Sequence, residues 1–149
     1  MRARWVAALD KNLLSTVLPV EYLLPRVVDD RGRIVLIAST SALDGRGGPY
    51  ATAKAAVAGY GRDLALRAGA RGITANVVVP GFVSGTGFFE VGGYGTPNSA
   101  MLEQAAAGTL VGRVGTPRDV THIVTKLLSV DAGWITGQLI SPNGGMVLH

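Results

Sequence analysis

Tyr50 and Lys54 are the residues whose types and spacing most suggest chemistry. They stand four positions apart, which places both side chains on one face of a helix, one turn apart. The positive charge of a lysine favours the ionised form of a nearby phenol, and a phenol tuned toward neutral pH is a suitable general acid or base. Ser39 precedes them, at the end of an apolar run, where its hydroxyl could hydrogen-bond a substrate oxygen.

The spacing of Tyr50 and Lys54 is weak evidence when it is taken alone, because such pairs occur by chance on many helices. The alternative interpretation is an ordinary pair on a helix surface. The order of the surrounding features favours the chemical interpretation: a strand end, then Ser39, then a loop, then the two residues at the start of a helix.

Hydrophobic patterning predicts the elements that must position these residues. Short continuous apolar runs predict strands buried on both faces, as in parallel sheets. The expected order is helix 3–28, strand 34–38, helix 49–68, strand 73–79, helix 99–107, helix 116–130 and strand 137–141. This alternation predicts an α/β fold with a parallel sheet and crossover helices, in a single domain over residues 1–149.

The three strand ends carry the candidate ligand-binding segments, residues 39–41, 80–83 and 143–145. In open parallel sheets, ligands bind beyond the carboxyl ends of the strands. We therefore expect these segments to converge on one crevice.

The first helix is apolar on two sides, which predicts that one side packs on the sheet and the other on a helix or a subunit. Pro19 predicts a bend in this helix and Pro25 predicts its end. Segment 82–111 contains Gly85, Gly87, Gly92, Gly93 and Gly95, which indicate a mobile loop over much of it. Long loops of this kind are often substrate lids.

Composition excludes several classes of protein. The net charge is +4, but the arginines are scattered rather than clustered in a stripe, so we expect no nucleic-acid surface. The absence of cysteine excludes disulfides and thiol catalysis, and His122 and His149 have no metal-ligand spacing. No apolar run approaches the length of a membrane span, and we expect a cytoplasmic protein.

Several segments together resemble the short-chain dehydrogenase/reductase family, in the right order and over essentially the whole chain. The segments are 33–39 (RIVLIAS), 49–56 (PYATAKAA), 73–81 (ITANVVVPG), 112–119 (GRVGTPRD), 135–138 (ITGQ) and 143–145 (NGG). The resemblance implies the C-terminal part of a Rossmann-type doubly wound parallel sheet, with three strands. It also implies that the family's N-terminal cofactor-binding half, with its glycine-rich fingerprint, is absent from this chain.

The resemblance assigns roles to individual residues. Tyr50 would be the acid/base, Lys54 would lower its pKa and hold the nicotinamide ribose, and Ser39 would orient the substrate carbonyl. Asn12 would belong to a water-linked proton relay. The cofactor would be NADP or NAD, with its nicotinamide end held by Tyr50, Lys54, Pro80, Gly81, Val83 and Thr86.

Some of these assignments have alternatives. Asn12 could be a plain exposed helix residue, and Thr86, one place later than the family's commonest spacing, could be loop filler. Ser41 competes with Ser39, because the loop from Ser39 to Tyr50 is slightly shorter than the commonest form.

The resemblance implies an oxidoreductase that interconverts a small-molecule carbonyl and an alcohol. In the family the first two helices commonly form a dimer bundle, so we expect a homo-oligomer through these helices. The alternative is a truncated, catalytically inactive remnant or an assembly subunit. The sequence does not identify the substrate, and it does not separate NADP from NAD because the selecting residues are not present.

Overall fold

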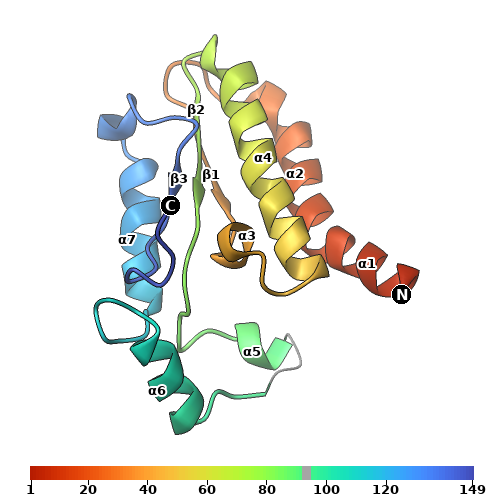
Figure 1. Ribbon diagram of the computed structural model, residues 1–149. Coiled ribbons are helices and arrows are strands. Elements are labelled where there is room, and N and C mark those ends of the chain that lie inside the picture. The colour runs from red at the N-terminus through yellow and green to blue at the C-terminus, as the bar shows by residue number, and fades with distance from the viewer. Residues whose placement is uncertain (92–94) are drawn as a thin grey trace.

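Three parallel strands form the centre of the molecule. The computed structural model describes residues 1–91 and 95–149. The strands are β1 (Arg33–Ile37), β2 (Thr74–Val78) and β3 (Leu139–Ile140), and they lie in the order β1-β2-β3. Helices cover both faces, with α4 and the N-terminal helices on one side and α7 on the other (Figure 1). The predicted α/β class with a three-stranded parallel sheet is confirmed.

The strands follow the predicted apolar runs closely. All five residues of β2 are buried, as expected of a central strand covered on both faces. β1 pairs with β2 from Arg33 opposite Thr74 to Ile37 opposite Val78. The third strand is shorter than the predicted 137–141, although backbone bonds from Gly137 and Val79 extend its contact with β2 at both ends.

Helix α4 (Pro49–Gly69) is the main support of the sheet. Its buried face contributes Val57, Leu64 and Ala65 to a core that includes Leu36 and Val77 of the strands. Alanine and glycine on this face allow a close approach, because a small side chain leaves room for the facing strand. The prediction of helix 49–68 is confirmed to within one residue.

The predicted first helix is divided into four helical segments. These are α1 (Arg2–Leu9), a π-helical turn η1 (Asp10–Leu14), α2 (Ser15–Leu23) and a 3-10 turn η2 (Leu24–Arg26). The chain changes direction between α1 and α2 (Figure 1). Pro19 lies inside α2, and the bend expected there stays a prediction; the irregular hydrogen bonding of this region lies upstream, in η1. Pro25 lies in the closing turn, as predicted.

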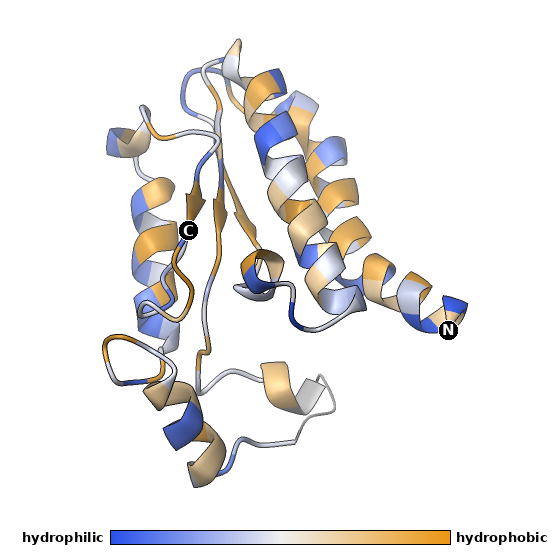
Figure 2. Cartoon of the chain, in the orientation of Figure 1, coloured by the Kyte–Doolittle hydropathy of each residue, from blue (hydrophilic) through white to orange (hydrophobic). Residues whose placement is uncertain are grey.

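The inner side of the N-terminal helices packs on α4 and the core, through residues that include Leu13, Val20 and Leu24. The outer side stays exposed, with Leu18 and Tyr22 more than 60% accessible. In Figure 2 the strands are almost uniformly hydrophobic, whereas these helices alternate between hydrophobic and hydrophilic residues around their axes. The expectation that one side packs internally is therefore met, and the other side has no cover within the described residues.

The segments after the strands contain more helix than the sequence predicted. Segment 39–49 includes a short helix α3 (Ser41–Asp44), and segment 82–111 includes α5 (Phe88–Val91) as well as the predicted α6 (Ser99–Ala107). The predicted loop glycines Gly92 and Gly93 lie outside the described residues.

Helix α7 (Pro117–Leu127) begins as predicted, with Thr116 at its cap and proline at its first position. The Asp119 carboxylate accepts bonds from the backbone and hydroxyl of Thr116, and the hydrogen bond from Arg113 holds the pKa of Asp119 well below its usual value. The predicted end near Val130 was wrong, because the chain turns into a 3-10 segment η3 (Val130–Ala132). No helix of the described residues is long and apolar enough to cross a membrane.

Candidate active site

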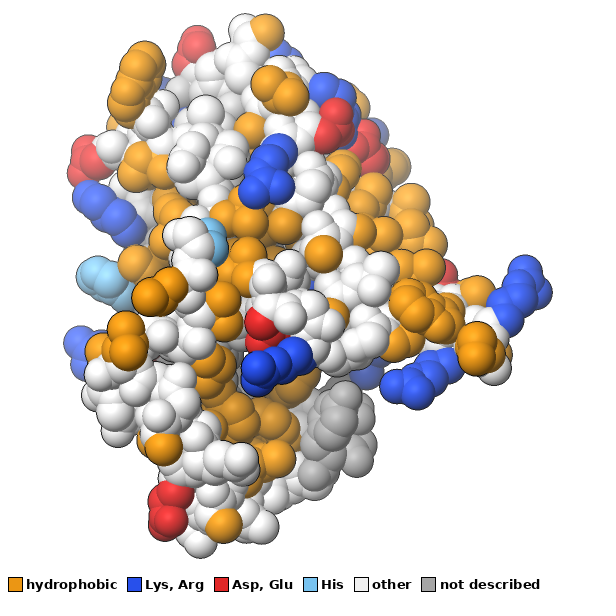
Figure 3. All heavy atoms as spheres, in the orientation of Figure 1, with side chains coloured by type: hydrophobic (Ala, Val, Ile, Leu, Met, Phe, Trp, Pro, Cys, Tyr) orange, Lys and Arg blue, Asp and Glu red, His pale blue; other side chains and the backbone are white. Residues whose placement is uncertain are grey.

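A cavity of about 630 Å³ lies at the carboxyl ends of β1 and β2. Figure 3 shows hydrophobic side chains in the recess between the lower lobe, which holds α5 and α6, and the rest of the molecule. All eight residues that the sequence singled out line this cavity, although they come from separate segments: Asn12, Ser39, Tyr50, Lys54, Pro80, Gly81, Val83 and Thr86. The structure therefore brings the predicted site residues together. Their individual chemical roles stay predictions.

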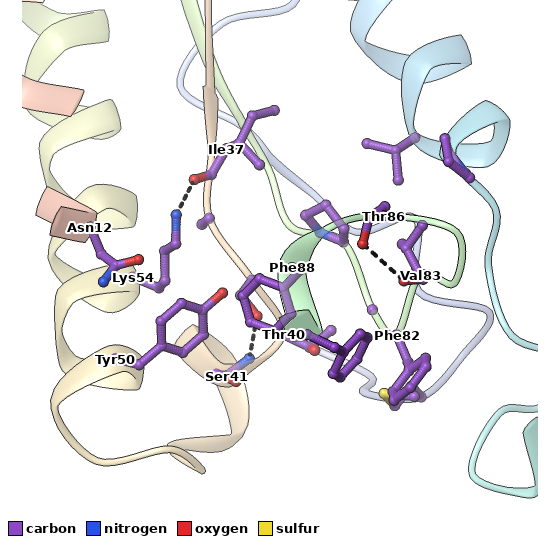
Figure 4. A pocket seen from close by; sticks show the side chains of 18 of the residues that line it. Asn12, Ile37, Thr40, Ser41, Tyr50, Lys54, Phe82, Val83, Thr86 and Phe88 are labelled. Atoms are coloured by element: carbon purple, nitrogen blue, oxygen red, sulfur yellow. Dashed lines mark hydrogen bonds between the residues drawn. The ribbon is translucent and has the colours of Figure 1, made fainter. Parts of the chain in front are cut away.

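Tyr50 lies in the first turn of α4, where the preceding loop and the helix start fix its position. Gly48, just before the helix, has φ +57°, a left-handed conformation that side chains other than glycine adopt at a cost. Pro49 then occupies the first helical position and is buried, as is favourable at a helix start. The Tyr50 ring projects into the cavity between Lys54 and Phe88 (Figure 4).

Lys54 lies one turn after Tyr50, and its ammonium group is held at the end of β1. Its Nζ atom donates a hydrogen bond of 3.0 Å to the carbonyl oxygen of Ile37 (Figure 4) and lies 5.9 Å from the centre of the Tyr50 ring. Burial lowers the pKa of Lys54 from its usual value, because a desolvated ammonium group is less stable than a hydrated one.

Asn12 reaches the cavity from the π-helical turn η1. Its Nδ2 atom donates to the carbonyl oxygen of Ala8 at 3.0 Å. Single π-helical turns inside α-helices occur frequently at functional sites. The alternative that Asn12 is a plain exposed residue is not supported, because its half-buried side chain lies beside Lys54 (Figure 4).

Ser39 and Ser41 both line the cavity. The Ser39 hydroxyl accepts a hydrogen bond of 3.3 Å from the backbone N–H of Ser41, the first residue of α3. This contact fixes the hydroxyl of Ser39 at the strand end, whereas Ser41 contributes its backbone to the same turn. The assignment of the substrate-orienting serine to Ser39 rather than Ser41 stays a prediction.

Residues 80–83 follow the end of β2 and line the cavity. Val83 forms a parallel bridge with Gly115, in which Gly115 donates to the Phe82 carbonyl and Ser84 donates to the Gly115 carbonyl. Because backbone groups alternate in direction along an extended chain, the N–H of Val83 points away from Gly115. The Thr86 hydroxyl donates a hydrogen bond to the Val83 carbonyl at 3.4 Å. Thr86 therefore belongs to the same group of cavity-lining residues as Val83 and is not a remote loop residue.

The third strand end was predicted to join the crevice, and it does so only indirectly. Asn143 is buried, and its side chain stabilises its own turn. The side-chain amide donates a hydrogen bond to the Val147 carbonyl, and the side-chain oxygen accepts one from the backbone N–H of Gly145. Of the C-terminal residues, Met146 is the one that lines the cavity. The expected convergence of three segments is therefore correct for two of them.

Sequence reasoning missed an aromatic part of the cavity wall. Phe82, Phe88 and Phe89 line it, together with Asp44, Val120 and Met146. The signal available in the sequence was the Phe88-Phe89 pair within a glycine-rich segment, which a loop interpretation leaves unexplained.

Comparison with known proteins shows the family of this chain. A family model described as enoyl-(acyl carrier protein) reductase matches residues 1–147. The chain belongs to the short-chain dehydrogenase/reductase family. Two similar relatives are the short-chain reductase protein NovJ of Streptomyces niveus, 33% identical over 95% of this chain, and the 3-oxoacyl-(acyl carrier protein) reductase FabG of Haemophilus influenzae, 36% identical over 97% of it.

Solved structures of this family have the same fold. A short-chain dehydrogenase/reductase from Brucella melitensis superposes on 100% of the chain with a TM-score of 0.86 at 24% identity. The angucycline C-6 ketoreductase LanV, solved with bound NADP, covers 93% of the chain with a TM-score of 0.80 at 28% identity. The chain spans 55% of NovJ, 58% of FabG, 58% of the Brucella protein and 52% of LanV.

The cavity residues fit the nicotinamide end of a dinucleotide. A carboxamide needs both a donor and an acceptor, and the backbone N–H of Val83 and the hydroxyl of Thr86 offer them within three residues. The Lys54 ammonium group and the Tyr50 hydroxyl are suitable partners for ribose hydroxyls. The glycine-rich loop that would hold a pyrophosphate in the family is not among the motifs of this sequence.

Proposed function

We propose that this chain carries the catalytic site of an NAD(P)-dependent oxidoreductase that interconverts a carbonyl and an alcohol. The observation that carries the proposal is the convergence of Asn12, Ser39, Tyr50 and Lys54 on one cavity. These residues come from η1, the end of β1 and the start of α4. A chance pair on a helix surface would not share a cavity with a serine and an asparagine from other elements.

The proposed roles follow from the chemistry of each group. In the reducing direction, the Tyr50 hydroxyl gives its proton to the substrate oxygen, and in the oxidising direction the Tyr50 phenolate takes that proton back. Ser39 donates a hydrogen bond to the same oxygen and orients the carbonyl. Lys54 favours the ionised form of Tyr50 through its charge, and Asn12 connects Lys54 to solvent through a water-linked relay.

The cofactor in this proposal is NADP or NAD. Bound nicotinamide supplies or accepts the hydride, and the protein supplies orientation and proton transfer. LanV, solved with bound NADP, supports NADP as the first cofactor to test. Val83, Thr86, Pro80 and Gly81 would hold the nicotinamide end, and Lys54 and Tyr50 would hold the ribose.

A second candidate is an inactive remnant or assembly subunit. The exposed apolar side chains of α2 and α4 favour assembly, since Leu18 is 62% and Leu66 is 83% accessible. The two candidates are compatible in one respect: in both, the same helices would join copies of the chain in a homo-oligomer. Only under the first candidate would that homo-oligomer act on a small-molecule substrate.

The first test is a titration of the purified chain with NADPH and with NADH, followed by nicotinamide fluorescence. We expect saturable binding that weakens about tenfold in Lys54→Met, because a charge-assisted hydrogen bond contributes roughly 1.5–3 kcal/mol. Lys126→Met is the matched control, since Lys126 lies on α7 and pairs with Asp131. Equal binding by Lys54→Met and wild type, or no saturable binding by a folded chain, would contradict a cofactor site formed by these residues.

A further inference from the structure

Aromatic rings form a continuous wall that begins at Tyr50. The ring centres of Tyr50 and Phe88 lie 5.8 Å apart, those of Phe88 and Phe89 5.2 Å apart, and those of Phe89 and Phe82 4.7 Å apart. The chain has three phenylalanines in all, and all three line this cavity. The phenylalanine side chains of the molecule are therefore concentrated beside the proposed acid/base.

Part of this wall is open to solvent. Phe88 is 46% accessible, and Figure 4 shows its ring between Tyr50 and Phe82. Exposed apolar surface is unfavourable in water, so a ligand that covers the ring gains binding energy. Val83, Val120 and Met146 extend the apolar lining beyond the rings.

The charges around the cavity are few. Among the described lining residues, Lys54 carries the positive charge and Asp44 the negative charge. Lys54 is engaged by the Ile37 carbonyl, and Asp44 accepts a bond from the Arg46 backbone. No arginine of the described residues lines the cavity, so it offers no bidentate partner to a phosphate or carboxylate on the substrate.

We propose that this site takes an uncharged ketone, or the corresponding alcohol, whose carbon is attached to a flat aromatic ring system. This inference rests on the proposed function, because it uses Tyr50 as the group that meets the substrate oxygen. A carbonyl oxygen at the Tyr50 hydroxyl places the adjoining ring against Phe88, and a second fused ring reaches toward Phe82 and Phe89.

The flatness of the ligand follows from the electrostatics of the rings. Aromatic pairs attract through offset-stacked or edge-to-face contacts at centre distances of 4.5–7 Å. A saturated ring of the same size fills the same space but lacks the charge distribution that these contacts require. The wall therefore discriminates between aromatic and saturated ketones of equal size.

The test compares 1-tetralone with 1-decalone, its saturated counterpart, by ligand-observed NMR titration of the whole chain. We expect wild type to bind 1-tetralone about fivefold more tightly, which corresponds to about 1 kcal/mol of aromatic pairing. The double variant Phe88→Leu/Phe89→Leu is expected to lose this preference. Trp134→Leu is the control, because Trp134 is a fully exposed aromatic residue that does not line the cavity.

Equal affinity of wild type for the two ketones, or binding of neither, would overturn the inference without any variant. A preference that survives in the double variant, with its fold verified by circular dichroism, would also overturn it. A chain that binds NADPH but prefers neither ketone would contradict this inference alone. A chain that prefers 1-tetralone and binds no nicotinamide cofactor would support the aromatic wall and contradict the proposed function.

Discussion

The position of Lys54 is set by the backbone of β1 as much as by its own helix. Ala38 donates its N–H to Val78 of β2, and because backbone groups alternate in direction along a strand, the Ile37 carbonyl points away from β2. That carbonyl accepts the bond from Lys54. The ammonium group is thus fixed beside Tyr50 by a backbone atom, in a partly desolvated position that lowers its pKa.

This desolvation predicts a pH-dependent stability difference between Lys54→Met and wild type. Below the lowered pKa of Lys54, the native state carries the full cost of the buried charge, and that cost disappears as the pH rises toward the unfolded value of 10.5. The free energy of unfolding of wild type should therefore rise relative to that of Lys54→Met between pH 7 and pH 10. Urea denaturation at several pH values measures this, and a difference that does not change with pH would show that Lys54 is not desolvated.

Helix α4 is the element that connects the core to the site. Its first two turns present Tyr50 and Lys54, while its middle packs on the sheet through Gly61, where an added Cβ would overlap the Val77 side chain. Gly59, on the exposed side of the same helix, has nothing within 4 Å of such a Cβ. These two glycines therefore have opposite structural roles only two residues apart.

The contrast predicts opposite effects of the same substitution. Gly59→Ala should stabilise the protein by about 0.5–1 kcal/mol, because alanine loses less backbone entropy in a helix. Gly61→Ala should destabilise it by roughly 1–3 kcal/mol, because it overpacks the helix–sheet contact. Thermal or urea unfolding of the two variants measures this, and a stabilising Gly61→Ala would show that α4 and β2 are not in close contact.

The elements that the sequence predicted well are those whose side chains repeat with a clear period. Helix α4 and strand β2 were predicted almost to the residue, because their apolar positions are fixed by burial. The π-helical turn at Asn12 was missed, because a single wider turn shifts the side-chain pattern by only about one position, which is hard to separate from the normal three- and four-residue steps of an α-helix.

The candidate site also divides into residues that a sequence pattern indicates and residues that no pattern indicates. The position of Ser39, Tyr50 and Lys54 in one cavity could be predicted because Tyr50 and Lys54 have a spacing that implies chemistry and Ser39 follows a strand. The aromatic wall was missed because Phe88 and Phe89 come together with Phe82 and Tyr50 only in three dimensions. Apolar residues in a loop carry no periodicity that would indicate which surface they face.

The N-terminal helices present an apolar side that no other described residue of the chain covers. Glu21 on α2 bonds to Tyr60 and Arg67 of α4, which holds the two helices together, while Leu18 and Leu66 remain exposed. Figure 3 shows hydrophobic side chains gathered over these helices. Apolar surface of this kind is typical of protein–protein contacts.

We therefore expect the chain to associate with itself through α2 and α4. Sedimentation velocity over a range of concentrations should show a homo-oligomer for wild type and a smaller species for the double variant Leu18→Gln/Leu66→Lys. Val130→Gln is the control, because Val130 is 79% exposed but lies in η3, beside α7. A wild-type chain that stays monomeric, or dissociation caused equally by the control, would contradict association through these helices.

In the proposed function, Tyr50 moves the proton in a carbonyl–alcohol interconversion. The most direct measurement is the rate of NADPH oxidation coupled to ketone reduction, compared between wild type and Tyr50→Phe at saturating ketone. Tyr22→Phe is the matched control, because Tyr22 is exposed on α2 and does not line the cavity. We expect the rate to fall at least about 100-fold in Tyr50→Phe, with ketone binding unchanged and with wild-type turnover in Tyr22→Phe. A Tyr50→Phe variant that keeps the wild-type rate, or a folded wild type that binds both ligands and reduces no ketone, would contradict it.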